Sequence, residues 1–192
     1  MNRFNYFFMA GLSMLLCTNV KAQDKLYDNT FPLSQVTLLD GPFKHAQDLN
    51  VEHLLQYDVD RLLQPFLKEA GLEPKAPAFP NWAGLDGHVG GHYLSALAIH
   101  YASTGNKECK ERMEYMLSEL KRAQDANGNG YVGGVPDSKR VFSQAKEGNI
   151  RAIHNLWVPL YNIHKIYAGL RDAWMYGGSE LAKEMFLKLC DW

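Results

Sequence analysis

Apolar residues recur at helical spacing along most of the chain beyond residue 40. Two helices are predicted over residues 42–57 and 59–70, and Pro65 is expected to kink or interrupt the second. Residues 91–103 are apolar on nearly every side, which predicts a buried helix. Residues 107–126 carry apolar side chains on one face and charges elsewhere, which predicts an amphipathic partner. The pattern indicates an all-α fold of helical hairpins.

Two segments depart from the helical pattern. Leu33–Leu39 alternates loosely between apolar and polar positions and is the best candidate for a short strand. It ends at Asp40, which is expected to cap a helix that has Pro42 at its first position. Residues 73–91 hold several prolines and then a run of glycines, which predicts a long loop of the kind that often carries function.

The helix–glycine–helix pattern recurs with a period of 72 residues. The matching pairs are His92 and His164, Ala96 and Ala168, Gly105 and Gly177, Glu108 and Glu180, Met113 and Met185, and Leu117 and Leu189. Such stacked hairpins are typical of an α/α solenoid or a closed α/α toroid. The roughly five helices predicted here are too few to complete either architecture. The last predicted helix also carries an apolar stripe that needs a neighbouring helix to cover it. We therefore expect the chain to be a truncated piece of a larger domain.

Composition and the first residues indicate an exported globular protein. The formal net charge is -1, with 46% hydrophobic and 21% charged residues, which shows no bias toward nucleic acid or membrane surfaces. Residues 1–22 have a positive start, an apolar stretch and small residues before Gln23, as in a secretory signal peptide. Export to the periplasm or the extracellular space is therefore expected. The two remaining cysteines, Cys109 and Cys190, are offset by about 13 Å along matching helices, too far for a disulfide, so we expect two buried thiols.

Two histidines four residues apart, His88 and His92, form the first candidate for a chemical site. A zinc-protease helix has the same spacing, but it needs Glu at the position of Val89 and an unbroken helix, whereas Gly90 and Gly91 are expected to break this one. The functional interpretation places His92 at the start of an inner helix, where a toroid opens into a pocket. The alternative is a structural histidine with satisfied hydrogen bonds.

Trp157 and His164 lie seven residues apart, on one side of a helix that Pro159 is expected to open. An aromatic ring beside an imidazole makes a plausible sugar platform, and the alternative is core packing at a helix seam. Asp86, in the long loop before the buried helix, is the carboxylate of most interest. A glycosidase usually needs two opposed carboxyls, and the sequence offers no convincing second one.

Residues 125–130 resemble the start of a calcium loop, with oxygen-bearing side chains at alternate positions followed by glycine. The bidentate glutamate that such a loop needs at its twelfth position is replaced by Pro136. A helix end followed by tight Asn-Gly turns explains the same residues.

Four segments in order resemble one known family. They are Leu33–Phe43 (LSQVTLLDGPF), Leu85–Ala98 (LDGHVGGHYLSALA), Asn127–Gly134 (NGNGYVGG) and Trp157–Leu170 (WVPLYNIHKIYAGL). Together they closely resemble the N-terminal half of the catalytic domain of bacterial beta-L-arabinofuranosidases, glycoside hydrolase families 127 and 146. The resemblance covers about Leu33 to Trp192. It implies that residues 23–192 are the N-terminal portion of an (α/α)6 barrel, whose partner is the remaining C-terminal half of the same domain.

The resemblance implies retaining hydrolysis of terminal β-L-arabinofuranosides from plant-type glycans. The family uses a cysteine nucleophile held at a zinc ion, with a glutamate as acid/base, in the later part of the barrel. Neither Cys109 nor Cys190 matches those cysteines, so no catalytic residue and no metal ligand is assigned to this chain. A pocket-lining role is carried over to Asp86, His88, His92, Trp157 and His164. The alternatives are a non-catalytic helical repeat that binds glycan or protein, and another α/α-toroid enzyme such as a polysaccharide lyase.

Overall fold

The computed structural model describes residues 31–80 and 84–192, and its compact unit spans Leu33–Trp192. The expected signal peptide, residues 1–22, lies outside the described residues. The α-helices are α2 (Pro42–Gln56), α3 (Val59–Glu69), α4 (His88–Thr104), α5 (Lys107–Asn127), α6 (Ser138–Lys146), α7 (Pro159–Met175) and α8 (Glu180–Asp191). Two short 3-10 helices, η2 (Leu33–Gln35) and η3 (Ile150–Asn155), accompany them. No described helix has the length and apolar character needed to cross a membrane.

The expected N-terminal strand is wrong. Leu33–Gln35 forms the 3-10 helix η2, and the residues after it are irregular and largely exposed. A strand needs a neighbour to pair its backbone groups, and the described part of the chain offers none here. Asp40 does not cap α2 either, since the cap residue is Gly41 and no side chain bonds to the helix start. Pro42 does stand at the first position of α2, as predicted.

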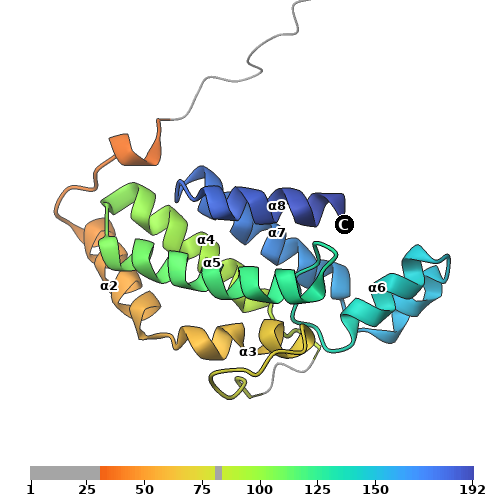
Figure 1. Ribbon diagram of the computed structural model, residues 1–192. Helices are drawn as coiled ribbons and strands as arrows, with labels where there is room; N and C mark the ends of the chain where they lie inside the picture. Colours follow the sequence, from red (N-terminus) through yellow and green to blue (C-terminus); the bar gives the residue numbers. More distant parts are fainter. Residues whose placement is uncertain (1–30, 81–83) are drawn as a thin grey trace, which may run out of the picture. The chain divides into compact units, whose positions relative to one another are not determined.

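The helical hairpins predicted from the 72-residue period are confirmed. α4 and α5 form one hairpin and α7 and α8 form the next, with α4 packed along α7. Figure 1 shows α5 lying over α4 and α8 beside α7. Met113 and Leu117 of α5 and their counterparts Met185 and Leu189 of α8 are all fully buried. α4 and α7 therefore serve as inner helices, and α5 and α8 as their outer partners.

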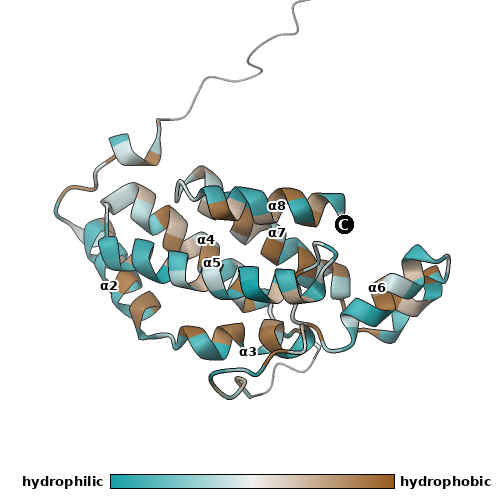
Figure 2. Cartoon of the chain, viewed as in Figure 1, coloured by the Kyte–Doolittle hydropathy of each residue, from teal (hydrophilic) through white to brown (hydrophobic). Residues whose placement is uncertain are grey.

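Both outer helices begin with the same kind of cap. The side chain of Asn106 accepts a hydrogen bond from the backbone N–H of Cys109 at 3.0 Å. Ser179 accepts one from the N–H of Ala182 at 3.4 Å. Each cap satisfies a backbone donor that the first helical turn leaves unpaired. The outer side of α5 is mostly hydrophilic in Figure 2, because its apolar residues face the core.

Gly90 and Gly91 do not break the inner helix, contrary to expectation. α4 starts at His88 and runs through both glycines. A Cβ added at Gly91 would lie 2.2 Å from the carbonyl oxygen of Lys165 in α7, and one at Gly90 would lie 2.8 Å from the ring of Phe66. The glycines are therefore required by close packing, which outweighs their low intrinsic helix propensity.

Tertiary packing also carries α3 past its proline. Asp58 caps α3, accepting hydrogen bonds from the N–H groups of Asp60 and Arg61. The helix then continues through Pro65 to Glu69. Phe66 is buried in the core beside three leucines of the same helix, Leu62, Leu63 and Leu67. Burial of this face offsets the hydrogen bond that the proline removes.

The two cysteines of the described residues are free thiols in different surroundings. Cys109 is fully buried in the core, as predicted. Cys190 is exposed near the end of α8, so the expectation of a buried thiol there is wrong. α8 buries Ala182, Met185 and Leu189, and Cys190 directly follows the last of them.

Candidate functional site

The first turns of α4 and the first half of α7 bring three histidines together. The rings of His88 and His92 have their centroids 6.4 Å apart and lie nearly perpendicular, at 85°. His164 of α7 lies close enough to His92 for its charge to act on the pKa of that imidazole. His92 and His164 are exposed and His88 is half-buried. Residues 72 apart in the chain thus lie beside each other on neighbouring inner helices.

Sequence reasoning missed two members of this group, Tyr161 and Lys165. The ring of Tyr161 lies 6.1 Å from that of His88, centroid to centroid. The ammonium group of Lys165 lies 4.5 Å from the centroid of the Tyr161 ring, within cation–π range. Tyr161 lies three residues before His164 and four before Lys165, and this helical spacing contained the signal. We call His88, His92, Tyr161, His164 and Lys165 the histidine cluster.

The surroundings of the His92 imidazole favour its neutral form by lowering its pKa. Partial burial of the ring lowers its pKa, and the charges of Lys165, His88 and His164 lower it further. The overall residue is exposed, but the ring is enclosed on one side by this group. A neutral imidazole has one N–H donor and one acceptor nitrogen, and both suit a sugar hydroxyl.

Asp86 lies in a tight turn directly before α4. Its carboxylate accepts a hydrogen bond from the backbone N–H of Gly84 at 2.9 Å. Gly84 and Gly87 both have positive φ, 83° and 90°, a conformation that favours glycine. The ring of His88 contacts the carbonyl oxygen of Leu85 through Nδ1. The turn therefore fixes the half-buried Asp86 next to the start of the cluster.

Trp157 does not lie on α7, so the helical-face argument from its seven-residue spacing to His164 was wrong. The helix begins at Pro159, and Val158 before it adopts a left-handed conformation with φ 42° and ψ 46°. The indole packs against the turn of Asp86: a Cβ on Gly84 would lie 3.2 Å from its ring. The side chain remains 61% exposed. The contact with Gly84, instead of a shared helical face, brings Trp157 to the site.

Asn162 joins the two segments that carry Asp86 and Trp157. It is only 6% exposed, and its Nδ2 donates to the carbonyl oxygen of Val158 at 3.1 Å and to that of Gly84 at 3.4 Å. Asn162 and Asp86 also border a cavity of about 10 Å³, which has room for a single water. Sequence reasoning missed Asn162, whose only signal was a polar residue between apolar ones in the helix.

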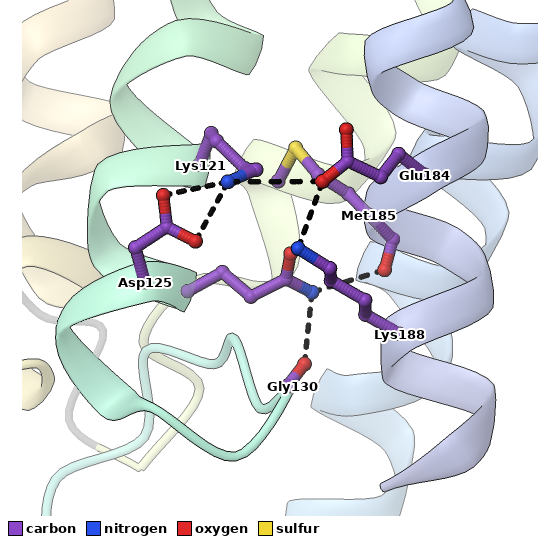
Figure 3. A network of polar contacts seen from close by, with 7 residues as sticks. Lys121, Asp125, Gly130, Glu184, Met185 and Lys188 are labelled. Atoms are coloured by element: carbon purple, nitrogen blue, oxygen red, sulfur yellow. Dashed lines mark hydrogen bonds and ion pairs between the residues drawn. The ribbon is translucent and has the colours of Figure 1, made fainter.

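The segment that resembles a calcium loop is a helix end, as the turn interpretation predicted. Gly128 caps α5 in a left-handed conformation with φ 76°. Asn127 donates to the carbonyl oxygen of Tyr131, and Asn129 accepts from the N–H of the same residue. Figure 3 shows Asp125 paired with Lys121, which also reaches Glu184 of α8. The oxygen-bearing side chains of this segment are therefore engaged in shaping the turn and in pairing with Lys121, which also links α5 to α8.

The zinc that the family resemblance implies does not fit the residues described here. Across 31–80 and 84–192, no three side chains of His, Cys, Asp or Glu are grouped so that they could hold a metal ion. Cys109 lies in the core, where burial raises the pKa of its thiol and disfavours the thiolate that binds zinc. The pair His88 and His92 keeps Val89 where a zinc protease has its glutamate.

Comparison with known proteins identifies the family. No curated protein matches the chain. A family model described as beta-L-arabinofuranosidase, GH127 catalytic domain, matches residues 35–192, which includes both hairpins, the turn of Asp86 and the histidine cluster. The match covers most of the chain, and its helical hairpins agree with the α/α-toroid architecture. The chain therefore belongs to the GH127 catalytic-domain family of glycoside hydrolases.

Proposed function

We propose that this chain forms the substrate-binding wall of a retaining glycosidase that removes terminal β-L-arabinofuranosyl residues from plant-type glycans. The observation that carries the proposal is the convergence of His88, His92 and His164 at the starts of two inner helices, inside the region that matches the family. Inner helices line the central hollow of an α/α toroid, so their exposed polar residues are placed to meet a sugar.

The side chains at this position suit a neutral furanose. Imidazoles can donate to and accept from ring hydroxyls. The carboxylate of Asp86, which accepts from the N–H of Gly84, has further lone pairs for them. The exposed indole of Trp157 supplies an apolar face for the C–H side of a sugar. A small number of polar groups around an aromatic surface is typical of small-molecule binding sites.

The bond-breaking groups belong, in this proposal, to the remainder of the catalytic domain. The family resemblance assigns the cysteine nucleophile, the zinc ligands and the acid/base glutamate to the later part of the barrel. We therefore propose that zinc is bound by the complete protein, and that the 192-residue chain alone does not hydrolyse arabinofuranosides. Residues 1–22 would direct export to the periplasm or the extracellular space, where an arabinose-containing glycan is the partner.

The test is hydrolysis of p-nitrophenyl β-L-arabinofuranoside by the complete protein and by two variants, His92→Ala and His164→Ala. Loss of one hydrogen bond of about 1–3 kcal/mol lowers kcat/KM by roughly 5- to 150-fold. His45→Ala, at an exposed histidine of α2, is the matched control and should retain full activity. Unchanged kinetics in both cluster variants would remove the histidines from the site. Binding without turnover in the wild type would favour a non-catalytic glycan-binding module.

A further inference from the structure

We propose that Lys165 binds a carboxylate on the glycan, so that the site prefers arabinofuranosides attached to a uronic acid. The inference rests on the proposed function and adds an anionic subsite to it. Lys165 directly follows His164 on α7, and its ammonium group lies over the ring of Tyr161 at 4.5 Å.

Contacts hold Lys165 both at its backbone and at its ammonium group. Its backbone carbonyl lies where α4 and α7 approach most closely, since a Cβ on Gly91 would come within 2.2 Å of it. Its ammonium group is held over Tyr161, whose ring in turn lies against His88. A cation–π contact restrains a lysine side chain while its N–H groups remain available to an anion. The charge is therefore preorganised beside the sugar-binding histidines.

The charge of the histidine cluster is unbalanced. The charged groups that act on His92 are Lys165, His88 and His164, and all three are cationic when charged. Within the described residues, no ion pair includes Lys165, whereas Lys121 and Lys188 on the outer helices each pair with a carboxylate at 2.6–2.8 Å. A half-buried cation that lacks a counter-ion attracts an anionic ligand more strongly than a fully solvated one does.

A carboxylate is the anion that this geometry favours. One ammonium and the neighbouring imidazole N–H groups offer donors to the two oxygens of a monoanion. In plant-type glycans, the common monoanionic group bonded to a ring carbon is the carboxylate of a uronic acid. The predicted ligand is therefore a β-L-arabinofuranosyl unit linked to a uronate, with the arabinose at the histidines and the carboxylate at Lys165.

The test compares two non-hydrolysable S-linked disaccharides, β-L-arabinofuranosyl-galacturonic acid and β-L-arabinofuranosyl-galactose, which differ only in the carboxylate. Calorimetry on the complete protein should show the acid binding roughly 10-fold more tightly, about 1.4 kcal/mol, and the advantage should shrink as salt is raised. Lys165→Met should abolish the advantage, so that the two ligands bind with equal affinity. Lys165→Arg should retain most of it.

Lys183→Met is the matched control. Lys183 of α8 also makes a cation–π contact, 5.3 Å from the ring of Trp174, but Trp174 lies nine residues beyond Lys165 on α7. This control variant should preserve the preference for the acid. Equal affinities of the wild type for the two ligands, or an undiminished preference in Lys165→Met, would overturn the anionic subsite while leaving the proposed function intact. Failure of the wild type to bind either ligand would overturn both.

Discussion

Gly91 and Gly169 face each other where the two inner helices cross. A Cβ on Gly169 would lie 2.7 Å from the carbonyl oxygen of Gly91, and a Cβ on Gly91 would lie 2.2 Å from the carbonyl of Lys165. Neither position has room for a methyl group. Because His92 lies one residue beyond Gly91 and His164 lies five before Gly169, this crossing sets the separation of the histidines.

Gly91→Ala should destabilise the fold, although Gly→Ala within a helix normally stabilises by about 1 kcal/mol. The new methyl group meets backbone atoms of α7, which cannot move without separating the helices. We expect a loss of about 2–3 kcal/mol in the free energy of unfolding, measured by urea denaturation. Ile99→Ala, at an exposed position of the same helix, is the control and should change stability by much less. A stabilised Gly91→Ala variant would contradict the close crossing.

Asn162→Ala should impair substrate binding more than turnover. The substitution removes the donor that joins the carbonyl groups of Gly84 and Val158, and so loosens both Asp86 and Trp157. We expect KM to rise roughly 10-fold while kcat stays within about twofold, as for the loss of an interaction made equally in ground and transition states. Steady-state kinetics of the complete protein provide the measurement.

A double-mutant cycle separates positioning from general destabilisation by Asn162→Ala. If Asn162 acts through Trp157, the effects of Asn162→Ala and Trp157→Ala on KM will not add. Asn155→Ala, at an exposed asparagine of η3, should leave KM unchanged. Additive effects of the first two substitutions would show that Asn162 does not position Trp157.

The two thiols of the described residues should differ in reactivity. Cys190 is exposed, whereas Cys109 is in the core and its burial raises the pKa of the thiol. A chain that starts at Gln23, and so lacks Cys17, should therefore react with Ellman's reagent rapidly at one thiol, and at two after denaturation. Cys190→Ser should remove the rapid phase. Rapid reaction of two thiols in the folded protein would show that the reagent reaches Cys109, and that the core around α5 is not closed.

Stability should fall as the pH is lowered from about 7.5 to 5.5, in part through His100. Burial lowers the pKa of this residue, which is 7% exposed, while Asp48 raises and Lys44 lowers it. The unfolded chain then binds more protons than the folded one below the ordinary histidine pKa, so stability decreases with falling pH. His100→Gln should flatten the dependence of Tm on pH across this window. Parallel curves for the variant and the wild type would exclude His100 as a contributor.

The hairpins were predictable from sequence because each depends on a local pattern that packing reinforces. Met113 and Leu117 predicted a buried face for one outer helix, and the 72-residue shift transferred that face to the next. Caps and breaks such as Asp58 and Gly128 were also predictable, since they act on their own backbone. The prediction of a strand at Leu33 was wrong because alternation of apolar and polar residues does not by itself supply a strand to pair with.

The site was predictable only in part, because its arrangement depends on tertiary contacts. His88, His92 and His164 follow from helix starts and the repeat, and the structure brings them together. The position of Trp157 depends on the non-helical backbone of Val158, which no periodicity encodes. Lys165 gains its significance from the ring of Tyr161 beneath it and from the helix that crosses beside it.

The left-handed backbone at Val158 limits which substitutions at this position can raise thermal stability without affecting Trp157. A β-branched residue in that conformation, directly before a proline, is disfavoured on two counts. Replacement by glycine would relax the backbone and increase thermal tolerance, yet it would also release the indole that precedes it. Under the sugar-binding role proposed for Trp157, selection for heat resistance and selection for sugar recognition would act in opposite directions at one residue.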